Sequence, residues 1–92
     1  MRLVFCQHAV QRMFERGITV DDAAAVLAGG RVIENYPNDN PYRSALWLGF
    51  VGGRPLHNVA AYNPDTGDRI VVTVYEPDPA QWASDCATRR EP

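Results

Sequence analysis

The sequence predicts an α+β fold: two N-terminal helices packed on a four-stranded antiparallel β-meander, with a short N-terminal edge strand and a C-terminal helix. Two observations carry this prediction. Apolar residues recur at helical spacing early in the chain, and the second half changes to short alternating segments separated by turn formers. Between two of these segments lies Gly52-Gly53, which is typical of a two-residue hairpin turn.

The first helix is expected over residues 7–16. The apolar stripe that it is predicted to turn toward the core consists of Ala9, Val10, Met13 and Phe14. Gly17 supplies a left-handed residue that ends this helix. The second helix begins at Thr19, which forms a capping-box-like pair with Asp22, and it ends before Gly29-Gly30.

The strands are expected where β-branched and aromatic residues alternate with polar ones. The edge strand covers residues 1–5, and the four meander strands cover residues 31–36, 44–51, 54–62 and 69–76. Turn formers fill the two longer connections. Pro77 and Pro79 end the last strand, and residues 80–89, which include Trp82, are predicted to form the C-terminal helix.

Length and composition indicate one globular domain covering residues 1–92. The chain is 46% hydrophobic and 22% charged, and no apolar run approaches the ~20 residues that cross a bilayer. We expect no signal peptide, and therefore a cytoplasmic location without membrane contact. Cys6 and Cys86 lack the spacing of a metal site, and they are more often reduced than bridged in a cytosolic chain. No metal or cofactor is expected.

All nine cations of the chain are arginines, and the net charge is -2. Net acidity argues against non-specific wrapping of nucleic acid, which usually needs a basic domain, but it leaves room for a local basic patch. Arginine suits bidentate contacts to phosphate or carboxylate. A high-GC genome would produce the same preference without functional meaning.

The first helix carries the most informative polar residues, because His8, Arg12 and Arg16 are spaced one turn apart. An imidazole that titrates near neutral pH is thereby placed beside two permanent cations that bind phosphate well. The stripe is interpreted either as a site for an anion or nucleic acid, or as the solvated face of the helix. Glu15 is placed to pair with the arginines and to weaken the positive charge.

The hairpin turn fixes the expected register and therefore the two faces of the sheet. The expected pairs are Val51 with Arg54, Leu48 with His57, Leu46 with Val59, Tyr62 with Arg69, His57 with Val74 and Val59 with Val72. The face predicted to lie under the helices holds Leu46, Leu48, Phe50, His57, Val59, Ala61, Ile70, Val72 and Val74. His57 is polar on this apolar face. It is either a buried histidine bonded to a backbone or hydroxyl partner, or a neutral acid–base group of lowered pKa.

The opposite face is predicted to stay open and to hold Trp47, Asn58, Tyr62, Thr73 and Tyr75. Aromatic side chains on an open sheet can stack nucleic-acid bases, and they can equally be buried in a homodimer or against a partner protein. The candidates for phosphate contacts at the edge of this face are Tyr42, Arg43, Arg89 and Arg90.

Several groups of residues recur as a recognisable combination along nearly the whole chain. They are His8-Ala9…Arg12-Met13…Glu15-Arg16-Gly17-Ile18-Thr19, Val32-Ile33-Glu34…Tyr36-Pro37, Leu48-Gly49, Arg54-Pro55-Leu56-His57 and Thr73-Val74-Tyr75-Glu76-Pro77-Asp78…Trp82. Together they resemble the small prokaryotic domain-of-unknown-function 4258 family, which is usually placed near the RelE-like and barnase-like ribonuclease toxins. The resemblance implies a RelE-like fold with two helices on an antiparallel sheet, and a small zinc-finger antitoxin-like protein as partner.

The resemblance implies metal-independent RNA cleavage by a toxin of a toxin–antitoxin module. The implied catalytic residues are His8, Arg12, Arg16, His57 and Tyr75. A histidine would take the 2′-hydroxyl proton, arginines would stabilise the charged phosphorane, and an acid would protonate the leaving oxygen. The acidic composition and the lack of lysine depart from the basic surfaces typical of ribosome-dependent toxins. The alternative is a non-catalytic module that binds a protein partner or a second copy through its open aromatic face.

Overall fold

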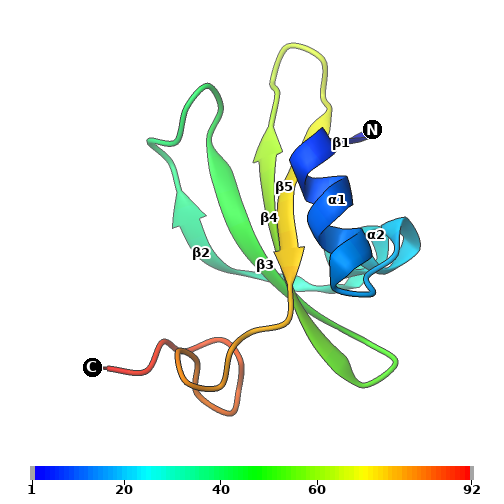
Figure 1. Ribbon diagram of the computed structural model, residues 1–92. Helices are drawn as coiled ribbons and strands as arrows, with labels where there is room; N and C mark the ends of the chain where they lie inside the picture. The colour runs from blue at the N-terminus through cyan, green and yellow to red at the C-terminus, as the bar shows by residue number, and fades with distance from the viewer. Residues whose placement is uncertain (1, 92) are drawn as a thin grey trace.

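The computed structural model describes residues 2–91, which form two helices and five strands (Figure 1). The helices are α1 (Gln7–Glu15) and α2 (Val20–Gly29). The strands are β1 (Leu3–Phe5), β2 (Arg31–Tyr36), β3 (Ser44–Val51), β4 (Arg54–Tyr62) and β5 (Arg69–Tyr75). The α+β class is as predicted from the sequence. Within residues 2–91, the helices are too short and too polar for either to cross a membrane.

All five strands join one sheet in the order β1-β5-β4-β3-β2. β2 to β5 pair with their sequence neighbours in antiparallel orientation, and β1 pairs in parallel with β5. The sheet is therefore mixed and five-stranded, because the predicted N-terminal edge strand joins the four antiparallel strands in parallel orientation. Parallel neighbours need a long connection, which the helices and the other strands supply here.

Local residues set the ends of both helices. Gly17 follows α1 with a φ of 66°, and the N–H of Ile18 bonds back to the carbonyl of Met13 over 2.9 Å. At the start of α2 the hydroxyl of Thr19 accepts a hydrogen bond from the N–H of Asp22 over 3.0 Å. The carboxylate of Asp22 accepts one in return from the N–H of Thr19 over 3.0 Å, which confirms the predicted capping box.

The buried stripe of α1 is narrower than predicted. Ala9 and Met13 are buried, whereas Val10 is 45% exposed and Phe14 is 86% exposed, so the core positions predicted for these two residues are wrong. α1 packs against β5, near one side of the sheet, while α2 packs against β3 and β4. At the side of the sheet only one line of side chains from α1 reaches the core.

A β-bulge changes the predicted register of the last two strands. β3 and β4 pair as predicted, and β4 and β5 begin in the predicted register, which shifts between Val59 and Ala60. The pairs beyond the shift are His57 with Tyr75 and Val59 with Thr73, where the sequence predicts Val74 and Val72. The extra residue in β5 turns every later side chain of that strand to the other face of the sheet.

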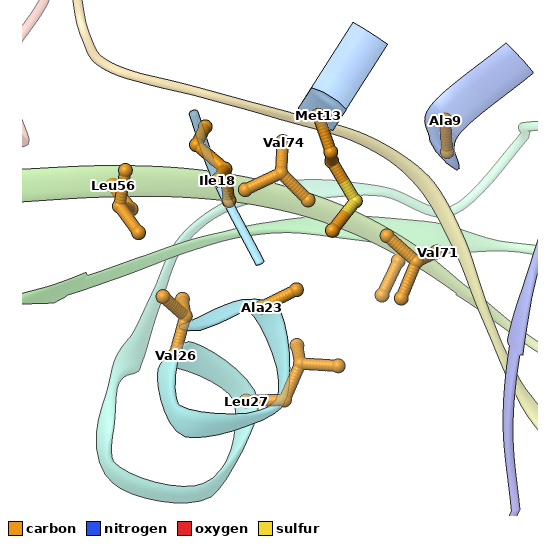
Figure 2. Packing of buried hydrophobic residues seen from close by; sticks show 10 residues of the cluster. Ala9, Met13, Ile18, Ala23, Val26, Leu27, Leu56, Val71 and Val74 are labelled. Carbon is orange, nitrogen blue, oxygen red and sulfur yellow. The ribbon is translucent and has the colours of Figure 1, made fainter. Parts of the chain in front are cut away.

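The helices cover the face of the sheet that the sequence predicts to be open (Figure 2). The buried cluster consists of Ala9, Met13, Ile18, Ala23, Val26, Leu27, Leu56, Ala60, Val71 and Val74. Leu46, Leu48 and His57 point to the opposite face, where they are buried as well. Because β3 and β4 carry buried side chains on both faces, the alternation along these strands does not reveal which face lies under the helices.

Residues 77–91 cover the second face, and they contain turns instead of the helix predicted over 80–89 (Figure 1). A single β-bridge joins Trp82 to Arg89. The carboxylate of Asp85 accepts hydrogen bonds from the N–H groups of Ala87 and Thr88, over 2.9 and 3.0 Å, and thereby competes with helical bonding. Trp82 is only 3% exposed, since its ring packs on His57.

Candidate functional site

The β2–β3 and β4–β5 connections lie at the same end of the sheet (Figure 1). A groove with a volume of about 640 Å³ is lined by residues from this part of the sheet. Its lining residues are Val32, Asn35, Pro37, Arg43, Ser44, Ala45, Trp47, Ala60, Ala61, Tyr62 and Arg69. The lining comes from the four antiparallel strands and from the β2–β3 connection, without a helical residue. The groove therefore occupies the part of the helix-covered face that the helices leave free.

Small side chains between two large rings make this part of the sheet hollow. Ala45 and Ala60 lie opposite each other on β3 and β4. Trp47 follows two residues after the first alanine, and Tyr62 follows two residues after the second. Since residues two apart share a face of a strand, the aromatic rings flank a floor of alanine.

Each aromatic ring of the groove is paired with an arginine. The guanidinium carbon of Arg69 lies 5.0 Å from the ring centroid of Trp47, and that of Arg43 lies 5.7 Å from the ring centroid of Tyr62. All lining residues belong to the described part of the chain, and none of them is an aspartate or a glutamate. The groove is thus a positively charged surface on a protein whose net charge is -2.

The groove gathers three of the residues that the sequence proposes for binding: Arg43, Trp47 and Tyr62. Arg69 completes the set, and sequence reasoning missed it as a binding residue. The predicted pairing of Tyr62 with Arg69, which the structure confirms, was the signal that could have identified it.

Two other proposed binding residues hold the fold together near the groove. Asn58 shares the face of Trp47 but is buried, and its Nδ2 donates a hydrogen bond to the carbonyl of Ala23 over 3.1 Å. The hydroxyl of Tyr42 accepts a hydrogen bond from Nδ2 of Asn63 over 3.1 Å. The predicted open face is wrong for Asn58, which α2 covers, and for Thr73 and Tyr75, which the bulge turns to the other side.

His57 is buried on the other face of the sheet, beneath residues 77–91. Its Nε2 lies 2.6 Å from the carbonyl oxygen of Cys86, and the ring is edge-on to those of Trp82 and Tyr75, with centroids 4.5 and 5.3 Å away. Burial lowers the pKa of His57, and the hydrogen bond to Cys86 offsets only part of this effect. The buried Nδ1 has no hydrogen-bond partner within residues 2–91. This geometry fits a neutral histidine that donates from Nε2 to a backbone carbonyl.

An ion pair beside His57 joins β2 to the C-terminal residues. Nε and Nη2 of Arg89 donate to the carboxylate of Glu34 over 2.7 and 3.0 Å, and the hydroxyl of Tyr36 donates to the same carboxylate over 2.6 Å. Arg89 lowers the pKa of Glu34. Burial, followed by the hydrogen bond to Glu34, raises the pKa of Tyr36 to about 12. Arg90 donates to the carbonyls of Pro79 and Trp82, so both Arg89 and Arg90 make contacts within the protein, and their predicted phosphate contacts stay a prediction.

The three residues of the stripe on α1, His8, Arg12 and Arg16, have different surroundings in the structure. His8 and Arg12 are exposed, and Nη1 of Arg12 lies 3.9 Å from the carboxylate of Glu15, as the sequence suggests. Arg16 instead donates from Nη1 to the carbonyl of Val74 over 2.9 Å. α1 lies on one face of the sheet and His57 on the other, so the structure does not bring the two histidines together.

Among the five implied catalytic residues, His57 and Tyr75 form the pair whose aromatic rings contact each other. Burial raises the pKa of the Tyr75 hydroxyl. Trp82 and Glu34 complete the surroundings of His57, and no motif in the sequence points to their position there.

Comparison with known proteins gives one match. No curated protein and no solved structure matches the chain. The model of a protein family described as "Domain of unknown function (DUF4258)" matches residues 5–76, which include every strand and both helices except the first two residues of β1. The chain therefore belongs to the DUF4258 family.

Proposed function

We propose that the groove binds single-stranded RNA. One observation carries the proposal: in an acidic protein, the lining of the groove holds two arginines, each over an aromatic ring, and no acidic side chain. Phosphates are bound by guanidinium groups, and unpaired bases stack on aromatic rings and guanidinium planes. A duplex hides the faces of its bases, so a single strand is the ligand that uses both kinds of side chain.

Cleavage of the bound RNA is a second proposal, which the position of α1 favours. α1 packs on the face of the sheet that forms the groove, and it presents His8 and Arg12 to solvent. His8 would take the 2′-hydroxyl proton, the 2′-oxygen would attack the phosphorus, and the 5′-oxygen would leave with a proton from an acid. Arg12 would stabilise the phosphorane. In this proposal the chain is a toxin-like, metal-independent ribonuclease, and a zinc-finger antitoxin-like protein is its partner.

Fluorescence anisotropy with a labelled single-stranded RNA tests binding in the groove. We expect Trp47→Leu and Arg69→Gln each to weaken binding about tenfold, because one stacked base contributes about 1–3 kcal/mol and one charge-assisted hydrogen bond a similar amount. Arg69→Gln should also reduce the slope of log K against log salt by about 0.7. Arg31→Gln removes the same charge outside the groove and is the matched control. Equal losses in Arg31→Gln and Arg69→Gln would contradict the groove as the binding site.

Induced expression in a bacterial host tests cleavage. We expect the wild type to slow growth and to cleave RNA, and His8→Ala to abolish both while it keeps the affinity for RNA. A wild type that does neither removes the ribonuclease proposal, whereas RNA binding depends on its own measurement. Sedimentation of the chain alone tests the alternative use of the groove. A change of mass in Trp47→Ala would assign the groove to a contact between copies.

A further inference from the structure

Residues 77–91, named here the C-terminal strap, are held together by hydrogen bonds among themselves. The bonds run from the N–H of Ala83 to the carbonyl of Thr88, from the N–H of Arg90 to the carbonyl of Gln81, and from Nε of Arg90 to the carbonyls of Pro79 and Trp82. They join residues no more than 11 positions apart. The strap therefore carries the contacts that define its own shape and does not need the sheet for them.

Few contacts attach the C-terminal strap to the sheet. Within residues 2–91, its hydrogen bonds to the rest of the chain are the one from His57 to Cys86 and the two from Arg89 to Glu34. Trp82 is the apolar anchor, and its ring packs on His57 while the guanidinium of Arg89 lies 4.6 Å from its centroid. The three hydrogen bonds and the ring of Trp82 thus meet around His57, and Asp85 adds an attraction to Arg31 of β2.

The strap also lies outside the part of the chain that the family model matches. That match ends at residue 76, so the strands that form the His57 face lie within the matched region and the strap follows them along the chain. With the strap in place His57 is 0% exposed. A segment that makes most of its hydrogen bonds within itself and few to the rest of the chain is suited to move as a unit.

We propose that the C-terminal strap is a pH-dependent cover, which closes over His57 when the imidazole is neutral and opens as a unit when the imidazole takes a proton. The neutral ring uses its N–H to bond Cys86, and its Nδ1 is buried without a partner. A proton on Nδ1 adds a charge and a donor for which the closed state has no acceptor. When the strap opens, water solvates the charge and accepts the hydrogen bond from Nδ1, so protonation and opening favour each other.

The charged groups that face His57 supply no free counter-ion for an imidazolium. Glu34 of β2 attracts the positive ring, but its carboxylate is already bound by Arg89 of the strap, which repels the ring. The two effects oppose each other. The burial of the ring is therefore the dominant effect, and it acts against the charged form.

The remaining neighbours of His57 are uncharged or contribute backbone. β3 places Leu48 opposite it, and β5 places Tyr75 opposite it, with a hydroxyl that stays protonated because burial raises its pKa. From the strap, Cys86 contributes its carbonyl. Opening exposes His57 and Tyr75, the two proton-transfer candidates of this face, and it leaves the groove on the other face unchanged. The inference does not rest on the proposed function.

Acrylamide quenching of Trp82 fluorescence, compared between about pH 8 and about pH 5, tests the cover, because Trp82 is 3% exposed when the strap is closed and this range includes the ordinary histidine pKa of about 6.5. The chain carries Trp47→Phe, which leaves Trp82 as its one tryptophan. The pKa of His57 is lowered in the closed state, so closure weakens as pH falls from about 6.5 toward that lower value. In this window we expect the opening constant of the strap to rise by up to about tenfold per pH unit. Amides of β3 and β4 should keep their protection against hydrogen exchange.

Two variants assign the effect to His57. His57→Gln keeps a side-chain N–H donor but does not titrate, and its strap should stay closed throughout the range. His8→Gln removes the other histidine of the chain and should open as the wild type does. Opening of His57→Gln with the pH dependence of the wild type would overturn the proposal, and so would quenching of Trp82 that rises only where the amides of β3 and β4 lose their protection.

A variant in the ion pair keeps the proposal testable if His57→Gln does not fold. Arg89→Gln removes both hydrogen bonds to Glu34, and it should raise the opening constant of the strap at about pH 8 by tenfold or more. The pH dependence should remain, since His57 is still present. Loss of the pH dependence in Arg89→Gln would show that the ion pair, and not His57, controls the strap.

Discussion

The buried side-chain amide of Asn58 donates a 3.1 Å hydrogen bond to the carbonyl oxygen of Ala23, and it ties the middle of β4 to α2. We expect Asn58→Ala to lower the free energy of unfolding by about 1–3 kcal/mol, because the variant loses this bond and leaves a space beneath α2. Asn58→Asp should be less stable still at neutral pH, since an ionised carboxylate is buried and cannot donate. Urea denaturation measures both. Asn58→Asp should regain stability as acid protonates it, and a flat pH dependence would contradict this.

Two adjacent glycines should respond in opposite directions to alanine. A Cβ on Gly30 would clash with the backbone oxygens of Leu48 and Val26, whereas a Cβ on Gly29 would meet nothing within 4 Å. We expect Gly30→Ala to lower the free energy of unfolding by about 1–3 kcal/mol through overpacking. Gly29→Ala should raise it by up to about 1 kcal/mol through helix propensity. Equal effects in thermal or urea unfolding would contradict the close approach of α2 to β3.

The raised pKa of Tyr36 makes the fold sensitive to alkali. The pKa of this hydroxyl is about 12 in the folded chain, above the ordinary value of about 10. Its contribution to stability is therefore present below about pH 10 and is lost as pH rises toward about 12. We expect urea unfolding to show this loss, and Tyr36→Phe to be less stable at neutral pH but less sensitive to alkali. Tyr42→Phe is the control, and it should keep the alkaline loss of the wild type.

The capping box of α2 should contribute measurably to the free energy of unfolding. Thr19→Ala removes the hydroxyl that accepts the N–H of Asp22, and we expect it to lower the free energy of unfolding by about 1 kcal/mol. Thr19→Ser keeps the hydroxyl and should lose much less. If the two variants unfold alike, the hydrogen bond at the helix start contributes nothing.

The parts of the fold that the sequence predicts well are those that local residues determine. Gly17 and the pair of Thr19 with Asp22 end one helix and begin the next, and Gly52-Gly53 joins β3 to β4 in the expected register. Each of these features depends on residues a few positions apart. The bulge between Val59 and Ala60 depends on the pairing of β4 with β5, so no local sequence pattern predicts it.

The candidate site was predicted only in part, because its residues come together through the sheet. The aromatic residues and Arg43 were identified by type, while the position of Arg69 over Trp47 follows from strand pairing. The sequence allows two interpretations of a histidine on an apolar face, and the burial of His57 is one of them. Its cover could not be foreseen, because residues 80–89 have a composition compatible with a helix and the contact of Trp82 with His57 spans distant parts of the chain.

The parallel pairing of β1 with β5 has a consequence for the order in which the chain folds. Phe5 lies opposite Val71, so the edge of the sheet cannot form until β5 has been synthesised. Until then α1 has no β5 against which to bury Ala9 and Met13. We expect α1 to stay unprotected in the growing chain until β5 has formed, and the β1–β5 edge of the sheet to close in one late step.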